Sequence, residues 1–163
     1  MNERPAPPDL ERVTQDIQAL IDRLGSLTLV TLDPEGDPEP SYAPYLFQDG
    51  AFHLFISQLA PHTGHLETQA RASVMLMADE TQTAQIFARE RLILRCSVDW
   101  PEGETSARVL DAMQERHGSV LSLLRRLPDF RLVRLNPRDG RYVAGFGKAF
   151  RLEGLRPVEW LSR

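Results

Sequence analysis

Apolar residues near the start of the chain recur at helical spacing. After a proline-rich stretch of eight residues, apolar positions fall three or four residues apart, at Leu10, Val13, Ile17, Leu20, Ile21 and Leu24. This spacing places them on one face of a helix, and Asp9 is a suitable N-cap residue. We therefore predict a mobile tail over residues 1–8, followed by an amphipathic helix that ends at Gly25.

Beyond Gly25 the pattern becomes that of β-strands. Short apolar or alternating runs are separated by residues typical of turns. The runs cover residues 27–32, 41–48, 52–57, 73–78, 92–98, 130–135 and 141–146. Strands that follow one another in this way favour an antiparallel meander over a parallel sheet. The expected fold class is α+β, an antiparallel split β-barrel of roughly six or seven strands with about three helices.

The second and third runs carry the clearest hairpin signal. Asp49-Gly50 lies between them, and this dipeptide is typical of a two-residue hairpin turn. Pro40 and Pro44 each lack a backbone N–H, so the second strand should lie at a sheet edge or be irregular. An irregular edge strand leaves room for a ligand.

Two more helices are expected. A short one begins near His62, and a long one covers residues 104–126. The long helix carries an apolar stripe at Leu110, Met113, His117, Leu121 and Leu124. This stripe should pack on the barrel, although Gly118 weakens the helix locally. Turn-forming residues at 136–140 separate the last two strands, and the two glycines around Phe146 indicate a bulge.

The composition is that of one soluble domain. The chain has 163 residues, of which 42% are hydrophobic and 26% charged, and this suits a single core. We expect one domain over residues 9–156 and a short C-terminal end at 157–163. The net charge of −4 disfavours nucleic acid as a partner. Because the chain shows no signal peptide and no membrane-length apolar run, and Cys96 is its only cysteine, we expect a cytoplasmic protein without a membrane partner.

The first candidate site is the segment 57–63, where a strand that ends with Ser57 leads into a helix that begins near His62 and Thr63. Free amides at a helix N-terminus, together with hydroxyl donors, suit a phosphate group. Thr63 equally suits simple capping of the helix. The residues alone leave both interpretations open.

The second candidate site is a pair of arginines, Arg89 and Arg91, at the start of the strand over 92–98. Arginine side chains suit phosphate or carboxylate groups. The alternative is a surface pairing with the acidic residues Asp79 and Glu80, which would contribute little energy if exposed. Both interpretations stay open.

The histidines do not predict a metal centre. His62 and His65 are three residues apart, but no further Cys, Asp or Glu ligand accompanies them. His117 lies on the apolar stripe and is expected to pack in the core, and His53 should face a sheet surface. Cys96, inside an apolar strand, is expected to be an inert buried thiol. The spacing also predicts no Ser-His-Asp triad.

Four short motifs occur in an order that resembles a known family. They are Ser41-Tyr42-Ala43-Pro44-Tyr45, Ile56-Ser57-Gln58-Leu59-Ala60-Pro61-His62, Asp79-Glu80-Thr81 with Phe87-Ala88-Arg89-Glu90-Arg91-Leu92, and Val143-Ala144-Gly145-Phe146-Gly147-Lys148-Ala149. Together they resemble the haem-utilisation proteins within the pyridoxamine 5′-phosphate oxidase-like, FMN-binding split-barrel superfamily. The resemblance implies a homodimer of split barrels, with each ligand site built at the subunit interface from both chains.

In flavin-binding members, the segment like 57–63 faces the phosphate of FMN, and the strand like 42–45 lies along the isoalloxazine ring. The resemblance therefore implies FMN as the cofactor. It implies contacts from Tyr42, Ala43, Tyr45, Ser57, His62, Thr63, Arg89 and Arg91.

In haem-degrading members, positions like Ser26 and Arg91 lie near the haem, and an aspartate like Asp129 orients the histidine that ligates the iron. That histidine lies in a C-terminal tail, and no histidine follows His117 in this chain. The resemblance thus implies haem as an alternative ligand, with the usual proximal ligand missing.

Three functions follow from this reading. The first is an FMN-dependent oxidoreductase related to the haem-utilisation proteins, in which the cofactor does the redox chemistry. The second is a haem-binding or haem-delivery protein without catalysis, or a haem-degrading oxygenase that lacks the usual proximal histidine. In it, the aromatic residues Tyr42, Tyr45 and Phe87 and the nearby arginines hold a flat anionic macrocycle. The third is a barrel that has kept the fold and lost the ligand.

Overall fold

The computed structural model describes residues 6–161, so residues 1–5 of the predicted tail and 162–163 of the predicted C-terminal end lie outside the described part. Its helices are α1 (Leu10–Arg23), α2 (Pro61–Gln69), α3 (Gly103–His117) and α4 (Val120–Leu124), with 3₁₀ turns η1 (Glu80–Gln82) and η2 (Ile86–Ala88). Its strands are β1 (Ser26–Leu32), β2 (Pro38–Pro44), β3 (Leu46–Gln48), β4 (Ala51–Ser57), β5 (Arg71–Met77), β6 (Arg91–Asp99), β7 (Phe130–Gly145), β8 (Lys148–Glu153) and β9 (Arg156–Trp160).

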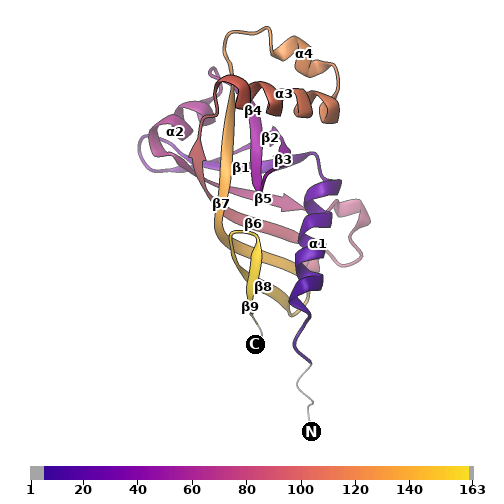
Figure 1. The fold of residues 1–163 in the computed structure, drawn as a ribbon. Coiled ribbons are helices and arrows are strands. Elements are labelled where there is room, and N and C mark those ends of the chain that lie inside the picture. Colours follow the sequence, from indigo (N-terminus) through magenta and orange to yellow (C-terminus); the bar gives the residue numbers. More distant parts are fainter. Residues whose placement is uncertain (1–5, 162–163) are drawn as a thin grey trace.

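The strands form one strongly curled antiparallel sheet (Figure 1). Seven of them follow the order β2-β1-β5-β6-β7-β4-β3, and β8 and β9 extend the sheet from the second half of β7. The two ends of the seven-strand path, β2 and β3, are separated along the chain by Tyr45 alone. The sheet therefore curls back towards its own start, and the predicted split β-barrel is confirmed.

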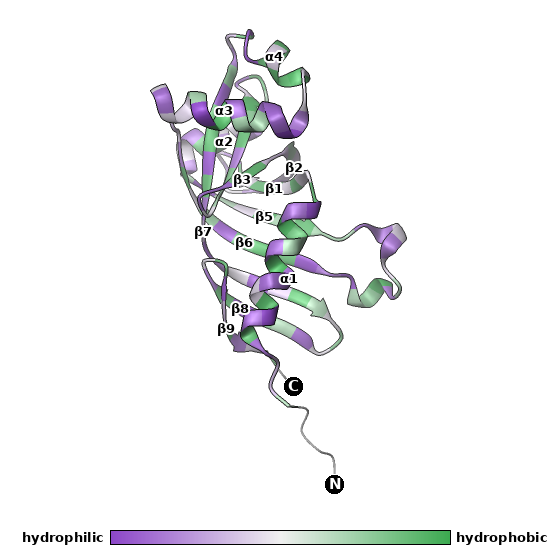
Figure 2. Ribbon diagram, turned by 45° about the vertical axis from the view of Figure 1, so that its right-hand side comes forward, coloured by the Kyte–Doolittle hydropathy of each residue, from purple (hydrophilic) through white to green (hydrophobic). Residues whose placement is uncertain are grey.

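The core fills the inside of this barrel, and α1 closes its side. Val13, Ile17, Leu20 and Ile21 are buried against the sheet, while the outer surface of α1 is hydrophilic (Figure 2). The predicted N-cap is confirmed, because the Asp9 carboxylate accepts a hydrogen bond from the backbone N–H of Glu11. The amphipathic spacing seen in the sequence thus corresponds to a helix that packs through one face.

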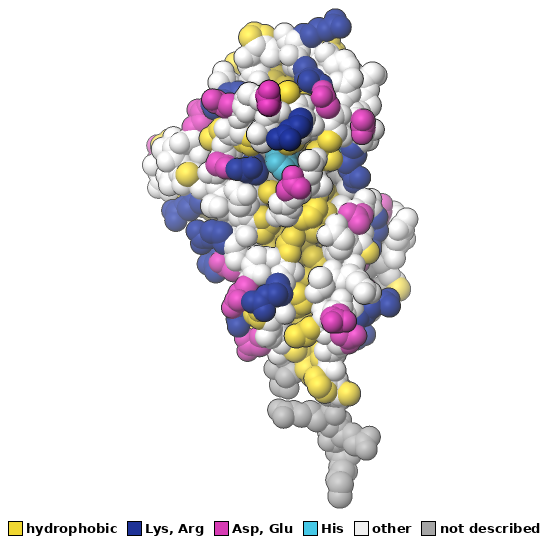
Figure 3. Space-filling model, viewed as in Figure 1, with side chains coloured by type: hydrophobic (Ala, Val, Ile, Leu, Met, Phe, Trp, Pro, Cys, Tyr) yellow, Lys and Arg dark blue, Asp and Glu magenta, His cyan; other side chains and the backbone are white. Residues whose placement is uncertain are grey.

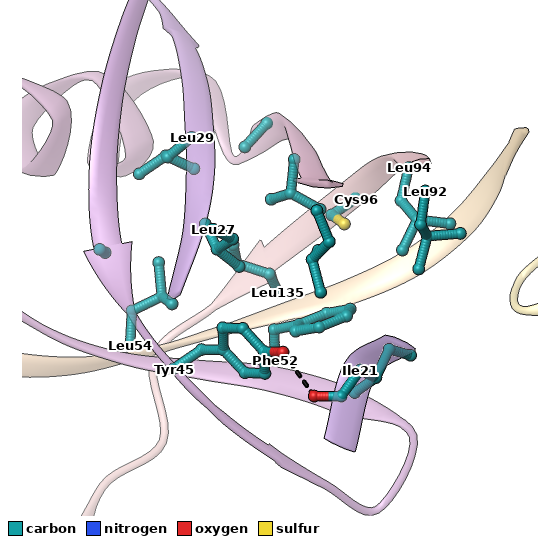
Figure 4. Packing of buried hydrophobic residues seen from close by; sticks show 14 of the residues in the cluster. Ile21, Leu27, Leu29, Tyr45, Phe52, Leu54, Leu92, Leu94, Cys96 and Leu135 are labelled. Carbon is teal, nitrogen blue, oxygen red and sulfur yellow. Dashed lines mark hydrogen bonds between the residues drawn. The ribbon is translucent and has the colours of Figure 1, made fainter. Parts of the chain in front are cut away.

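Tyr45 lies at the centre of this core (Figure 4). Its side chain is fully buried, and its hydroxyl donates to the carbonyl of Ile21 at 2.6 Å. Its ring meets Phe52 edge to face, with 5.2 Å between the ring centroids. This hydrogen bond satisfies a hydroxyl that would otherwise be costly to bury, and it fixes the end of α1 to the break between β2 and β3.

The predicted hairpin at Asp49-Gly50 is confirmed. Both residues have positive φ, 53° and 74°, as a type I′ turn requires, and β3 pairs with β4 across it. The strand predicted over residues 41–48 is instead two strands, because β2 pairs with β1 and β3 pairs with β4. β2 lies at the edge of the sheet, as Pro40 and Pro44 indicated.

The prediction of two separate strands over 130–135 and 141–146 is wrong. A single strand of 16 residues, β7, runs through both ranges and is the long orange strand of Figure 1. Its first half pairs with β4 and its second half with β6 and β8. The turn-forming residues produce only a register shift, beside Arg95 and Cys96 of β6. A bulge accommodates them because partner strands continue on both sides.

The long helix predicted over 104–126 is also interrupted. Gly118, with φ 86° and ψ −166°, ends α3, and α4 follows as a separate short helix. Val109 and Met113 are the buried residues of α3. They pack with Leu46 and Leu132 into a second, smaller core. The apolar stripe in the sequence therefore spans a turn rather than one continuous helix face.

The C-terminal β8–β9 hairpin is not predicted by the sequence pattern. Phe146 and Gly147 turn the chain from β7 into β8, and Gly147 has φ 66°. The register shift between Val143 and Gly145 confirms the predicted bulge. β9 crosses the expected boundary at residues 156–157. Among the described residues, no helix combines the length and apolarity needed to cross a membrane.

Candidate functional site

The segment 57–63 connects β4 to α2, and its side chains are held by internal bonds. The N-cap position of α2 is Ala60, with no side-chain cap, so the capping interpretation of Thr63 is wrong. The Thr63 side chain is 1% exposed, and its hydroxyl donates to the carbonyl of Ser57 at 2.6 Å. Thr63 therefore stabilises the connection between the strand and the helix.

Ser57 and Asp129 lie side by side, although they are 72 residues apart in the chain. The hydroxyl of Ser57 donates to Oδ2 of Asp129 at 2.5 Å, and the backbone N–H of Gln58 donates to the Asp129 carbonyl at 2.7 Å. The antiparallel pairing of β4 and β7 places Ser57 opposite Phe130 and so causes this contact. The structure thus joins a residue assigned to flavin phosphate with one assigned to the haem pocket.

Two histidines attach α2 to the sheet. Nδ1 of His62 lies 3.0 Å from the hydroxyl of Ser41, and Nδ1 of His65 lies 2.9 Å from the hydroxyl of Thr31. Burial lowers the pKa of His62, and the charge of His65 lowers it further. Nε2 of His62 is buried and has no hydrogen-bond partner among the described residues. His62 is therefore favoured as a neutral imidazole at neutral pH.

His53, expected at a sheet surface, is only 3% exposed. It shares its face of β4 with Phe55, which packs against the small core that Val109 and Met113 of α3 help to form. That face is covered, so the expectation is wrong. His117 is half-buried, and its Nε2 lies 2.7 Å from the Tyr45 carbonyl oxygen.

The two candidate arginines donate hydrogen bonds to backbone carbonyls of the segment before β6. Nε of Arg89 donates to the carbonyl of Ala78 at 2.7 Å, and its Nη1 lies 3.4 Å from a carboxylate oxygen of Glu80. This contact supports the surface-pairing interpretation for Arg89. Arg91 is half-buried, and its Nη1 donates to the carbonyl of Arg89 at 2.9 Å. The remaining guanidinium donors of Arg91 are available for another acceptor.

The candidate residues at 42–45 face opposite sides of the sheet. Tyr42 is 66% exposed, whereas Ala43 and Tyr45 are buried. Burial raises the pKa of Tyr45 to about 12. Only Tyr42 offers its ring to a ligand outside the barrel, while Ala43 and Tyr45 can act there only through their backbone.

A network that the sequence analysis missed links α1 to the end of β7. The buried hydroxyl of Tyr142 donates to Glu90 at 2.6 Å, and Glu90 also pairs with Arg23 of α1. Burial and the hydrogen bond to Glu90 raise the pKa of Tyr142. A cavity of about 490 Å³ lies beside this network, between α1 and β8. Figure 3 shows a band of hydrophobic side chains between α1 and the β8–β9 hairpin.

The outward-facing side chains of β2, β1, β5, β6 and the second half of β7 form a surface that we call the outer face. Cross-strand pairing aligns one row across it, made of Tyr42, Thr28, Met75, Ile93 and Arg141. A second row, two residues further along the strands, contains Met77, Arg91 and Val143. Ser26 lies two residues before Thr28, so its side chain is on the same side of β1, in the direction of Met77. The candidate haem-pocket residues Ser26 and Arg91 therefore share one surface.

The outer face is partly apolar. Met75, Met77 and Ile93 are half-buried on it, whereas the alternate residues of the same strands are buried in the core. Sequence reasoning assigned no role to these three residues or to Arg141. The alternation of side chains within the runs 73–78 and 92–98 was the available signal. It could not show that the strands adjoin in this register.

The residues present fit the phosphate of a flavin poorly. Residues 24–70 contain no lysine or arginine, so the segment 57–63 brings no cation of its own. Pro61 has no backbone N–H, and the N–H of Thr63 donates to the Ala60 carbonyl at 3.0 Å. Few amides of α2 therefore remain for an anion, although such amides are the usual basis of a phosphate site. Among the described residues, no three His, Cys, Asp or Glu side chains are grouped to hold a metal ion.

The outer face fits the flat body and the carboxylates of a haem, but not its usual iron ligand. Half-buried methionine and isoleucine side chains suit the apolar macrocycle, and arginines suit the propionates. The described histidines lie on β4, α2 and α3. None of them stands in the rows of the outer face.

Comparison with known proteins identifies the family. Residues 13–144 match the pyridoxamine 5′-phosphate oxidase family. Heme oxygenase HutZ of Vibrio cholerae serotype O1 is 34% identical over 145 residues, which are 88% of this chain and 82% of that protein. This relationship covers nearly all of the barrel.

Solved structures agree with this assignment. The crystal structure of HutZ, a heme storage protein from Vibrio cholerae, has a TM-score of 0.73 at 34% identity, over 80% of this chain and 91% of that chain. A heme binding protein from Mycobacterium smegmatis has a TM-score of 0.79 at 26% identity, over 91% of this chain and 60% of that chain. Campylobacter jejuni ChuZ shares the fold, with a TM-score of 0.87 at 24% identity, over 98% of this chain and 67% of that chain. The chain therefore belongs to the pyridoxamine 5′-phosphate oxidase family and, within that superfamily, to the branch of haem-utilisation proteins.

Proposed function

We propose that this protein binds haem on the outer face of its barrel, as a homodimer in which two outer faces enclose the ligand. The observation that carries the proposal is the pairing of Met77 with Arg91 on that face, next to the row that holds Met75 and Ile93. Ser26 lies two residues before Thr28 and on the same side of β1. The names of HutZ and of the mycobacterial relative, which refer to heme oxygenase, storage and binding, support the same ligand.

The chemistry of the outer face supports a planar, amphipathic ligand. Half-buried Met75, Met77 and Ile93 offer an apolar surface to the macrocycle, and burying that surface contributes roughly 25 cal/mol per Å². Tyr42, in the row of Met75, adds an exposed aromatic ring. A bound haem supplies iron chemistry, and these residues supply its platform. The proposal concerns binding and delivery, and it assigns no residue to haem breakdown.

Titration of the purified protein with haemin tests this proposal. We expect a stoichiometric Soret shift at micromolar haemin and a dimer in light scattering. Ile93→Asp should weaken binding at least about tenfold, because it places a charge in the apolar platform. Leu123→Asp is the matched control, since Leu123 is 60% exposed on α4. A native protein that shows no Soret shift would rule the function out.

A flavin-dependent oxidoreductase is the second candidate, and the match to the pyridoxamine 5′-phosphate oxidase family favours it. In that case the freshly purified protein carries flavin absorbance in the blue. The double change Ser57→Ala with Thr63→Ala should then release the flavin, and normal flavin binding by this variant would remove the assignment of the segment 57–63.

A further inference from the structure

The outer face contains a groove, and its lining includes none of the candidate ligand residues. One cavity of about 710 Å³ is lined by Ile93, Arg95 and Arg141, among others. A second, of about 390 Å³, adjoins it and shares Ser73 and Arg95. Together they run across β1, β5, β6, β7 and β8. The larger volume lies within the range of small-molecule sites, about 300–1,000 Å³.

The groove is rich in positive charge, although the chain as a whole carries −4. Its lining includes Arg71, Arg95, Arg138, Arg141 and Arg151. Among the described residues of this lining, Asp139 alone carries a carboxylate, and it pairs with Arg95 at 2.6 Å. The cations of the groove thus exceed its anions.

Two of these arginines are free to take a ligand. Arg151 pairs with Glu159 and Glu153, at 2.8 Å and 3.5 Å. By contrast, Arg71 and Arg141 are exposed and pair with no carboxylate among the described residues. An arginine without an internal partner keeps its fork of donors for a carboxylate or phosphate.

Most of the other residues that line the groove are apolar, with Ser73 as a polar exception. Ile93 lines the larger cavity, and Val30, Leu32 and Pro38 line the smaller cavity together with Arg71. Gly140 also lines the larger cavity. The groove therefore combines an apolar wall with a cationic wall, which suits a flat molecule that bears carboxylates.

We propose that Arg141 and Arg71 bind the carboxylates of a tetrapyrrole whose ring rests on Ile93 and the neighbouring apolar residues. This inference rests on the proposed function and names the residues that hold the anionic end of the haem. Arg141 pairs with Ile93 across β6 and β7, so it stands in the same row as the apolar residues Met75 and Ile93. Arg71 stands on the far side of Arg95, at the start of β5.

The test compares haemin with haemin dimethyl ester, which keeps the ring and iron but has no free carboxylates. The double variant Arg71→Gln with Arg141→Gln should weaken haemin binding by about tenfold to a hundredfold, since charge-assisted hydrogen bonds are lost. The ester should bind the native protein weakly, and the double variant should not weaken it further. Arg108→Gln with Arg126→Gln, on exposed positions elsewhere, carries the same charge change and should bind haemin normally.

Metal-free protoporphyrin IX provides a readout that does not depend on the iron ligand. Its fluorescence change on binding should show the same loss in the double variant. If haemin binds the native protein but the ester binds equally well, or the double variant retains full affinity, this inference is overturned while the proposed function stands. If neither porphyrin binds the native protein, both are overturned.

Discussion

The hydroxyl of Ser57 donates a 2.5 Å hydrogen bond to the carboxylate of Asp129 and so fastens the end of β4 to the turn before β7. The same hydroxyl accepts a hydrogen bond from the backbone N–H of Leu59 at 3.0 Å. Ser57 thus completes a local structure, and Asp129 already has a donor within the chain. The two residues therefore belong to one polar cluster.

Ser57→Ala should therefore reduce stability even without any ligand. The change removes a donor from a part-buried carboxylate, and we expect a loss of about 1–2 kcal/mol in the free energy of unfolding. Urea denaturation of the unliganded protein measures this. Asp129→Asn is the companion variant: it keeps an acceptor for the Ser57 hydroxyl and should cost less. Equal stability of Ser57→Ala and the native protein would contradict the structural role.

Tyr42→Phe and Tyr45→Phe are matched variants, because each removes one tyrosine hydroxyl. Tyr42 lies in β2 and Tyr45 lies between β2 and β3. Tyr45 loses a buried hydrogen bond to the Ile21 carbonyl, so Tyr45→Phe should cost about 0.5–1.5 kcal/mol. Tyr42 is 66% exposed, and its change should leave the free energy of unfolding nearly unchanged. The measurement is the shift in urea midpoint. A larger loss for Tyr42→Phe would show that Tyr42, not Tyr45, anchors this strand.

Gly140→Ala should destabilise the barrel. A Cβ at this position would lie 2.1 Å from the Ile93 carbonyl oxygen, so β6 and β7 must separate locally. We expect a cost of about 1–3 kcal/mol, as in other overpacked sites. Gly64→Ala is the control, because nothing lies within 4 Å of its Cβ and it stands inside α2. That change should be neutral or stabilising, and thermal unfolding of both variants tests the contrast.

Stability should fall as the pH is lowered from 7 towards 5. Burial lowers the pKa of His53 and of His62 in the folded protein below the ordinary value of 6.5. The unfolded chain then binds protons that the folded chain resists, so stability is lost as the pH falls through 6.5 and below. Urea midpoints at pH 7 and pH 5 measure the loss. His53→Gln with His62→Gln should flatten this dependence, and an unchanged slope would argue against these two groups.

The local sequence pattern was sufficient to predict much of the fold. The helical spacing from Leu10 to Leu24 predicted α1 and its cap at Asp9, since one helix face must be apolar to pack on a sheet. Asp49-Gly50 predicted the hairpin turn, because few residues tolerate its backbone conformation. Cys96 was predicted to be buried, and its side chain is 1% exposed. These features depend on residues close together in the chain.

Long-range strand pairing decided the rest. The turn-forming residues between 136 and 140 form a bulge within one strand because β7 pairs with β4, β6 and β8 along its length. Register across four strands, and not local spacing, aligned Thr28, Met75, Ile93 and Arg141 into one row. The sequence by itself determined which residues could face outward, because side chains alternate along a strand. Only the tertiary structure decided which of them share a surface, because that depends on which strands become neighbours.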